Sequence, residues 1–191
     1  MWTNWAGDQR CQPAVVERPS TVSEAVGAVE RAVTAGRCVR VAGSGHSFTG
    51  AVLTDGSLVA LDRMGALLDA DPAAGLVRVQ AGITIRAFND ALADRGLALA
   101  NLGDIDAQAI AGAVATATHG TGATLRNLSA QVRALQLVTA AGEVLEIDGG
   151  AAAGGVPRRG RPRSGGAFPL TPGTSVGLLS LRQSKPTLVP G

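Results

Sequence analysis

The chain of 191 residues contains no tyrosine, and aromatic residues make up only 3% of it. Any core must therefore be aliphatic, and the 46% of residues that are hydrophobic are enough for one domain. The only cysteines are Cys11 and Cys38, too few for a disulfide framework or a zinc site. This scarcity favours a reduced, cytoplasmic setting, and we expect no metal centre.

Long apolar runs are also absent from the chain. No stretch reaches the roughly 18 consecutive apolar residues of a membrane-spanning helix. The N-terminal residues have neither the basic nor the apolar region of a signal peptide. We therefore expect no membrane partner and no secretory leader.

Acidic residues are missing from the last part of the chain. All 15 of them fall within residues 1–148, together with 11 of the 17 basic residues, whereas residues 149–191 are basic and acid-free. Glycine, proline, arginine and serine dominate residues 149–177, and the apolar pair at 178–179 is too isolated to predict an element. The composition predicts a disordered C-terminal tail. Because no aromatic residues are interleaved at stacking spacing with its four clustered arginines, we expect no nucleic-acid partner.

The hydrophobic pattern places three helices within the first 148 residues. The first begins with a capping box at residues 20–24 and ends at Gly36, the second begins at Thr84, and the third covers residues 107–113. The side chains expected to face inward from the first two are Ala25, Val26, Val29, Val33, Ile85, Phe88 and Leu92.

Strands are predicted between and after these helices. Their expected ranges are 38–42, 58–61, 67–71, 76–81, 132–140 and 143–147. Turn residues at 71–75 and 141–142 make hairpins of the last four. Helices and strands do not alternate strictly, which indicates an α+β fold of two small α/β sub-layers.

Residues 39–50, VRVAGSGHSFTG, place one of only two histidines directly after glycines that follow a strand. Such glycines let backbone N–H groups approach a phosphate, because no Cβ blocks the way. Phe48 and Thr49 occupy positions where a dinucleotide fingerprint and a nucleophile elbow need glycine, which disfavours both motifs. A diphosphate loop with a reactive histidine and a glycine turn with an incidental histidine both remain open.

The second histidine lies in residues 112–122, GAVATATHGTG, where nearly every side chain is small. A surface of small residues lets a flat ring lie close to the backbone, and threonine hydroxyls can bond its polar edge. A tightly packed, alanine-rich buried segment explains the same composition equally well. The spacing of the two loops, about 70 residues, is compatible with one long ligand that contains a diphosphate.

Taken together, these segments closely resemble the FAD-binding domain of the p-cresol methylhydroxylase and vanillyl-alcohol oxidase (PCMH-type) superfamily. The branch they resemble holds the sugar-lactone and alditol oxidoreductases. The resemblance is carried in order and spacing by residues 2–5, 41–50, 54–56, 79–82, 96–103 and 112–122.

The resemblance implies an FAD cofactor bonded covalently to His46 through the 8α-methyl group of the flavin. It implies that Gly103 lies beside the reactive edge of the flavin and that Asp104 lies near flavin and substrate. It assigns no catalytic residue to this stretch. The other positions that it assigns to FAD are Ala42, Gly43, Ser44, Gly45, Ser47, Phe48, Ala109, Gly112, Thr116 and His119.

Residues 149–191 depart from the family pattern, which continues with a further strand over the FAD and then a substrate domain. We therefore divide the chain into an FAD-binding domain, residues 1–148, and an unrelated Gly/Pro/Arg-rich tail, with the substrate domain absent. The tail has the composition of a GC-rich gene read out of frame, which suggests a frameshifted or truncated family member.

Three functions follow from these observations. The first is an oxidoreductase that passes a hydride from a sugar-lactone or polyol carbon to histidine-linked FAD, and that is inactive until a substrate domain is supplied. The second is a flavin-binding module, or truncated pseudo-enzyme, without catalysis of its own. The third is a small nucleotide- or nucleic-acid-binding protein that uses the basic tail, which the lack of aromatics at stacking spacing among the clustered arginines disfavours.

Overall fold

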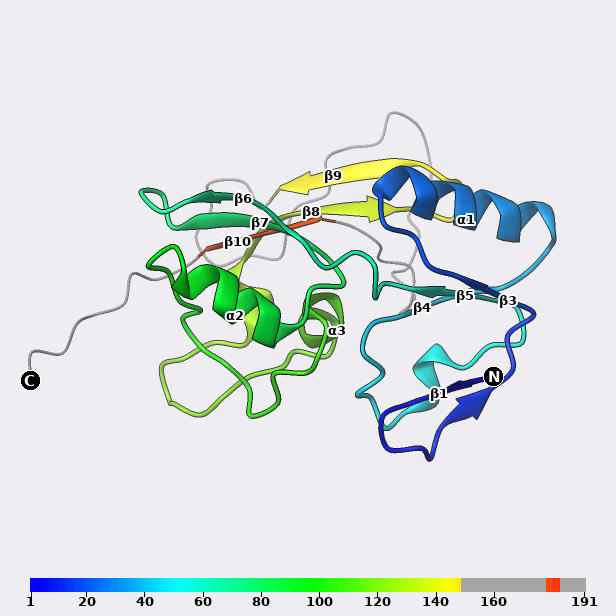
Figure 1. Ribbon diagram of the computed structural model, residues 1–191, viewed down its shortest axis with the longest axis horizontal. Coiled ribbons are helices and arrows are strands. Elements are labelled where there is room, and N and C mark those ends of the chain that lie inside the picture. Colours follow the sequence, from blue (N-terminus) through cyan, green and yellow to red (C-terminus); the bar gives the residue numbers. More distant parts are fainter. Residues whose placement is uncertain (149–177, 183–191) are drawn as a thin grey trace, which may run out of the picture.

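The computed structural model describes residues 1–148 and 178–182, and the rest of the predicted tail lies outside the described residues (Figure 1). In chain order the elements are β1 (Trp2–Thr3), β2 (Arg10–Cys11), β3 (Val15–Glu17), α1 (Val22–Thr34), β4 (Val39–Ala42), the 3₁₀ turn η1 (Gly50–Val52), β5 (Ser57–Ala60), β6 (Leu67–Asp71), β7 (Leu76–Gln80), α2 (Ile85–Ala93), α3 (Ile110–Ala115), the 3₁₀ turn η2 (Leu128–Gln131), β8 (Val132–Val138), β9 (Val144–Asp148) and β10 (Leu178–Arg182).

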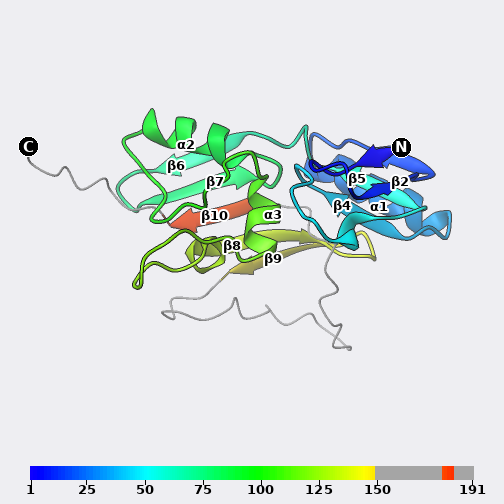
Figure 2. The same cartoon turned by 90° about the horizontal axis from the view of Figure 1, so that it is seen from below.

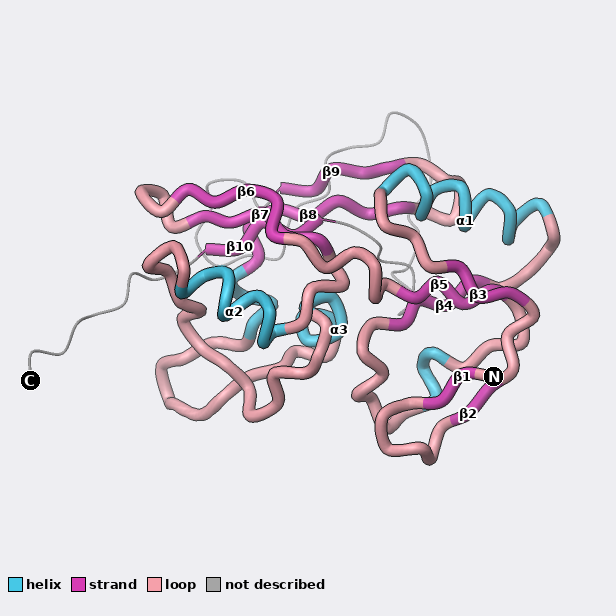
Figure 3. The backbone as a smooth tube through the Cα atoms, viewed as in Figure 1, coloured by secondary structure: helices cyan, strands magenta, loops and turns pink. Residues whose placement is uncertain are grey.

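A small parallel sheet forms the first sub-layer, in the order β3-β5-β4. Both outer strands are in register with β5, so Val15 and Val39 each lie opposite Ser57. Helix α1 connects β3 to β4 and runs along this sheet, while the short antiparallel hairpin β1–β2 lies on the other side (Figures 1 and 3). Because the strands are parallel, their carboxyl ends open toward one edge, where ligands bind in many α/β sheets.

The second sub-layer is a five-stranded antiparallel sheet in the order β6-β7-β10-β8-β9. Helices α2 and α3 cover one of its faces (Figures 1 and 2). The two layers and the mixed element order confirm the predicted α+β class.

Strand β10 corrects the prediction that residues 178–182 form no element. Its backbone pairs antiparallel with β7, with Leu178 opposite Gln80, and with β8, with Leu179 opposite Leu135. The strand thus occupies the centre of the larger sheet. Pairing on both edges depends on partners some 45 and 100 residues away along the chain, and local sequence carries no signal of such partners.

Helix α1 follows its predicted bounds, with a shifted capping box. The Thr21 hydroxyl accepts from Glu24 N at 3.1 Å, and the Glu24 carboxylate accepts from Ser20 N at 2.7 Å instead of from Thr21 N. These bonds lower the pKa of Glu24, with the bond from Ser20 N as the largest cause. Val33, expected to face inward, is 55% exposed, because the buried stripe of the helix passes through Ala32 and Val29.

Helix α3 begins at Ile110, three residues later than predicted. The preceding backbone is extended because it pairs with the start of α2: Thr84 and Ala109 form an isolated antiparallel bridge, and Gln108 O accepts from Ile85 N at 2.9 Å. The first turn of α2 therefore fixes the entry to α3.

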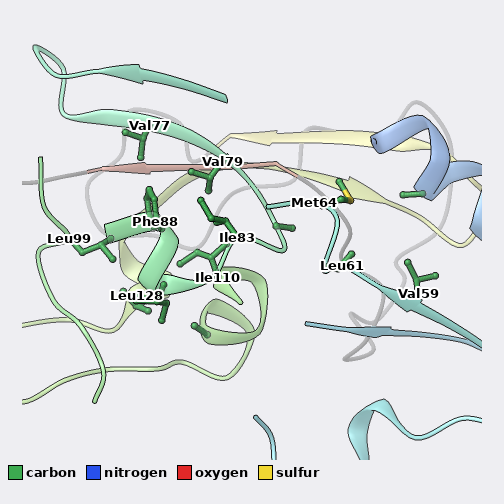
Figure 4. Close-up of a cluster of buried hydrophobic side chains, with 14 of the residues drawn as sticks. Val59, Leu61, Met64, Val77, Val79, Ile83, Phe88, Leu99, Ile110 and Leu128 are labelled. Atoms are coloured by element: carbon green, nitrogen blue, oxygen red, sulfur yellow. The ribbon is translucent and has the colours of Figure 1, made fainter. Parts of the chain in front are cut away.

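One hydrophobic core runs through both sub-layers. Val77 and Val79 of β7 point from the large sheet toward Phe88 of α2 and Ile110 of α3 (Figure 4). The same cluster continues through Leu61 and Met64 to Val59 of the small sheet and Val29 of α1. The predicted inward residues Ile85, Phe88 and Leu92 are fully buried. Because both sheets contribute to this one core, the core fixes their position relative to each other.

Candidate functional site

The loop of residues 43–48 follows the carboxyl end of β4. Gly45 has a φ of +70°, a left-handed conformation that disfavours any other residue, and a Cβ there would lie 3.1 Å from the Trp2 ring. Within the described part of the chain, none of the six backbone N–H groups of this loop donates a hydrogen bond. A left-handed residue in a run of free N–H groups is typical of backbone sites that bind anions.

The β1–β2 hairpin holds this loop by its carbonyl groups. Trp5 N donates to Gly45 O at 2.9 Å, and the buried Asn4 side chain donates to Ser47 O at 3.0 Å. These two contacts use carbonyl groups of the loop and leave its backbone N–H groups without a partner among the described residues.

The histidine of the loop stacks on an aromatic side chain. The rings of His46 and Trp5 are 5.3 Å apart between centroids, with an angle of 22° between their planes, and Phe48 meets Trp5 edge-on at 6.4 Å. Trp5 is 64% exposed, so it is not the core anchor that its size suggests. The contact with His46 was missed by sequence reasoning, because nothing local to residue 5 indicates its partner.

The loop lacks the context of the two disfavoured motifs. Only the short 3₁₀ turn η1 follows it, whereas a dinucleotide fingerprint and a nucleophile elbow both lead into a helix. The Ser47 hydroxyl bonds to Thr49 Oγ1 at 3.0 Å and not to a histidine. The local geometry therefore fits an anion-binding turn.

Segment 109–119 lies against this loop. A Cβ built on Gly43 would lie 2.9 Å from the Ala109 methyl, so the close approach of the two segments requires glycine at position 43. In helix α3 Ile110 and Ala113 are buried, while Gly112, Ala115 and Thr116 are exposed. The segment is thus not the buried alanine-rich packing element that its composition also allowed.

Helix α3 ends in a strained turn. Thr118 N donates to Ala113 O at 2.9 Å and Ala117 N donates to Val114 O at 3.3 Å, which together form a Schellman motif. Its left-handed position is filled by Ala117, with a φ of +54°, although glycine is usual there. The turn brings the hydroxyls of Thr116 and Thr118 to 3.4 Å from each other.

The second half of this segment packs against residues 101–103. A Cβ on Gly103 would lie 2.8 Å from the Thr118 methyl, and one on Gly120 would lie 2.0 Å from Leu102 O. His119 is exposed, and its Nδ1 lies 2.9 Å from Gly120 O. The structure therefore brings the predicted positions 43, 103, 109, 112, 116 and 119 onto neighbouring segments.

The two carboxylates at 104 and 106 lie in different surroundings. Asp104 is exposed, whereas Asp106 forms a two-bonded ion pair with Arg86 of α2, with distances of 3.0 Å and 2.9 Å. The hydrogen bonds from Arg86 lower the pKa of Asp106 and raise the pKa of the Arg86 guanidinium. Asp106 is therefore an anchor for the loop that carries Gly103 and Asp104.

This ion pair predicts a pH-dependent contribution to stability. Because the pKa of Asp106 is lower in the folded chain than its unfolded value of about 3.9, the pair stabilises the fold above that pH. We expect the contribution to be lost as the pH falls through the lowered pKa. The measurement compares the unfolding free energies of the wild-type chain and Arg86→Met from neutral to strongly acidic pH. A difference between them that stays constant over this range contradicts the assignment.

A family model described as "FAD binding domain" matches residues 13–148. The chain belongs to the FAD-binding domain family. The matched range contains both small-residue loops and excludes the β1–β2 hairpin. The FAD-binding domain is thus shown, in agreement with the resemblance read from the loops.

Curated relatives place this FAD-binding domain near the aldonolactone oxidoreductases. The chain is 46% identical over 150 residues to the L-gulono-1,4-lactone dehydrogenase of Mycobacterium tuberculosis, an overlap of 78% of this chain and 35% of that protein. It is 36% identical over 143 residues to the L-gulonolactone oxidase of Scyliorhinus torazame, or 75% of this chain and 32% of that one. The chain thus spans about a third of the length of these relatives.

The fold agrees with a solved flavoenzyme structure. The 6-hydroxy-D-nicotine oxidase of Arthrobacter nicotinovorans superposes with a TM-score of 0.74 at 19% identity, over 93% of this chain and 38% of that chain. At this identity the likeness shows a shared fold alone.

The residues present fit an FAD. The diphosphate of the cofactor needs backbone donors, and residues 43–48 offer a run of them with no partner among the described residues. Gly112 leaves open space at the backbone, since a Cβ there meets nothing within 4 Å, and Gly43 lets the segment of Ala109 lie against the loop. Over residues 1–148 and 178–182 there is no cluster of His, Cys, Asp or Glu suited to a metal ion, and no helix long and apolar enough to span a membrane.

Proposed function

We propose that this chain binds FAD with its diphosphate on loop 43–48 and that His46 bonds covalently to the flavin. The single observation that carries the proposal is the run of N–H groups around His46 that have no acceptor among residues 1–148 and 178–182. In this arrangement Gly43, Ser44, Gly45 and Ser47 hold the diphosphate, and Ala42 and Phe48 flank them. Positions 103, 109, 112, 116 and 119 line the rest of the cofactor.

The covalent bond joins an imidazole nitrogen of His46 to the 8α carbon of the flavin. One methyl C–H bond and the imidazole N–H bond break as the C–N bond forms. Two protons and two electrons leave in the process, and dioxygen takes them up as hydrogen peroxide. His46 suits this role because its ring is half-buried and held by the stack with Trp5.

The reaction that we propose for this domain is the oxidation of a sugar lactone or polyol. When bound, FAD supplies the two-electron chemistry as the acceptor of a hydride from a substrate carbon. Asp104 is exposed on the loop beside Gly103 and is the described residue that we place near the substrate. The names of the relatives support this substrate class.

A flavin-binding module without turnover is the second candidate. The observation that favours it is that the match covers 35% of the mycobacterial relative, so most of that protein lies outside the match. We propose that catalysis needs a substrate-binding part of that kind. Reduction of the bound flavin by L-gulono-1,4-lactone without oxygen, followed by its absorbance, separates the two: bleaching supports the enzyme, and unchanged absorbance supports the module.

The FAD-binding domain that we propose comprises residues 1–148. The pairing of β10 with β7 and β8 counts against a tail that is wholly unrelated to this domain. The frameshift hypothesis for the tail is tested by translating the coding DNA in the other frames. Family sequence in another frame downstream of codon 148 supports it, and the absence of such sequence counts against it.

The free thiols of Cys11 and Cys38 support a reduced, cytoplasmic setting as part of the same proposal.

A methyl group added at Gly112 is expected to raise the stability of the chain and to weaken its binding of FAD. A Cβ at Gly112 meets nothing within 4 Å, so Gly112→Ala is expected to stabilise α3 by about 1 kcal/mol. The same methyl projects where we place FAD, and we expect FAD binding to weaken about tenfold, or about 1.4 kcal/mol. Thermal unfolding of the apo chain and an FAD fluorescence titration measure the two effects.

The matched control is Gly27→Ala in α1, where the added methyl meets only the flexible end of Arg31 at 3.1 Å. This variant is expected to gain stability with no change in FAD affinity. Unchanged FAD affinity in Gly112→Ala contradicts the placement of the cofactor along α3.

A further inference from the structure

The β1–β2 hairpin and the turn between its strands contact the loop that carries His46. These contacts use carbonyl groups of the loop and the His46 ring, and none of them uses the backbone N–H groups of residues 43–48, so diphosphate binding alone does not explain them. Its contacts gather on three consecutive residues of the loop, Gly45, His46 and Ser47.

Asn4 ties the hairpin to the loop. Its side-chain amide donates to Ser47 O at 3.0 Å and to Asp8 Oδ1 at 2.7 Å, while its Oδ1 accepts from Gln9 N at 3.1 Å. All three contacts are made by a side chain that is only 5% exposed. Buried, fully bonded amides hold their surroundings in one arrangement. The backbone on both sides of His46 is thus fixed, since Trp5 N also donates to Gly45 O.

Trp5 then restricts the histidine ring itself. The imidazole has no hydrogen bond to another described residue, so the stack with the Trp5 indole is the contact that limits its rotation. Trp5 is 64% exposed and is not part of the hydrophobic core cluster. Trp5 is thus an exposed tryptophan whose ring contacts are with His46 and Phe48 of the loop, and its stack bears directly on the His46 ring.

We propose that Asn4 and Trp5 are positioning residues that set the His46 imidazole in the orientation needed for attachment to FAD. The proposal rests on the proposed function, because it concerns the same histidine and the same cofactor. Attack by a ring nitrogen requires a defined direction, and misplacement by about 1 Å costs up to about 100-fold in rate. Non-covalent FAD affinity comes instead from the backbone donors, which Trp5 does not touch.

The test compares the full chain with Trp5→Leu and the conservative Trp5→Phe. In the apo chain, the ring protons of His46 are read by NMR against those of His119, the other histidine of the chain. FAD is then added in air, and the gain of covalent mass is followed with time, together with the total FAD bound. Leu68→Ala removes another exposed apolar side chain, from β6 in the larger sheet, and serves as the control.

We expect Trp5→Leu to move the His46 signals and leave those of His119 in place. Covalent attachment is expected to slow at least about tenfold, with total FAD affinity changed less than about threefold. Trp5→Phe should restore most of the rate, and Leu68→Ala should match the wild type. Since Trp5 is largely exposed, the urea concentration at the midpoint of unfolding should stay close to that of the wild type.

Two outcomes overturn the proposal: His46 signals that do not move in Trp5→Leu, or covalent attachment at the wild-type rate. The wild-type chain reports separately on the proposed function. If it gains no FAD mass at all, that function is wrong and the proposal about the hairpin fails with it. If it gains the mass and Trp5→Leu does so equally fast, only the role of Trp5 is wrong.

Discussion

His46→Ala is expected to yield a chain that loses all of its flavin on acid precipitation, whereas the wild-type pellet stays yellow. A covalent bond survives denaturation, and within loop 43–48 only the imidazole offers a nitrogen nucleophile on a side chain. The backbone N–H groups around it do not depend on that side chain. We therefore expect His46→Ala to bind FAD reversibly, with flavin in the supernatant after precipitation.

His119→Ala is the matched control, because it removes the other histidine of the chain from an exposed position on the neighbouring segment. Its Nδ1 contacts only the adjacent Gly120 carbonyl among the described residues. We expect this variant to keep its covalent flavin. A yellow pellet from His46→Ala, or a colourless pellet from His119→Ala alone, shows that the attachment site has been misassigned.

Gly120→Ala is expected to destabilise the chain by about 3 kcal/mol, through overpacking of a close backbone contact. The added Cβ would lie 2.0 Å from Leu102 O and 2.6 Å from Asn101 Oδ1. Backbone oxygen cannot rotate away, and the Asn101 amide is buried and held by its bond to Arg126 O at 3.1 Å. Residues 101–103 must therefore separate from residues 118–120, which displaces Gly103 and His119 together.

The unfolding free energy of Gly120→Ala is measured by urea denaturation of the apo chain, beside Gly65→Ala. A Cβ at Gly65 meets nothing within 4 Å, so that control should lie within about 0.5 kcal/mol of the wild type. FAD affinity should fall only in Gly120→Ala. Equal stability of the two variants would mean that the two segments do not pack as described.

Much of the fold is predictable from local sequence. Helix α1 has its cap at Thr21 and its stop at Gly36, whose φ is +63°, and the β6–β7 hairpin turns where Asp71 accepts from Ala73 N. These features depend only on residues a few positions away, so the local sequence is enough to predict them. The start of α3 was missed because a bridge to Thr84, distant in sequence, keeps Ala109 extended.

Strand β10 also could not be predicted from local sequence, because its pairing partners are even more distant along the chain. Its five residues pair with β7 and β8, and no pattern within the five identifies either partner. Composition is a poor guide to a central strand of this kind, because the long-range pairing decides its conformation.

In the candidate site, too, local sequence predicts some features, whereas others depend on contacts between residues far apart in the chain. The small residues of the two loops predicted a ligand-binding surface, and the structure brings Gly43 and Ala109 into contact. The hold of the β1–β2 hairpin on the loop was not predictable, because the stack of Trp5 on His46 joins positions 41 residues apart. Sequence therefore identified the residues proposed to contact FAD, and the structure was needed to find those that orient them.

The most direct test of the account is the mass of the chain purified with ample riboflavin and then denatured. We predict a gain of one FAD, less the two hydrogens lost in forming the bond, and after proteolysis the gain should reside on the peptide that contains His46. A chain of unmodified mass, or a flavin on any other peptide, would contradict the claim that loop 43–48 holds the cofactor against this histidine.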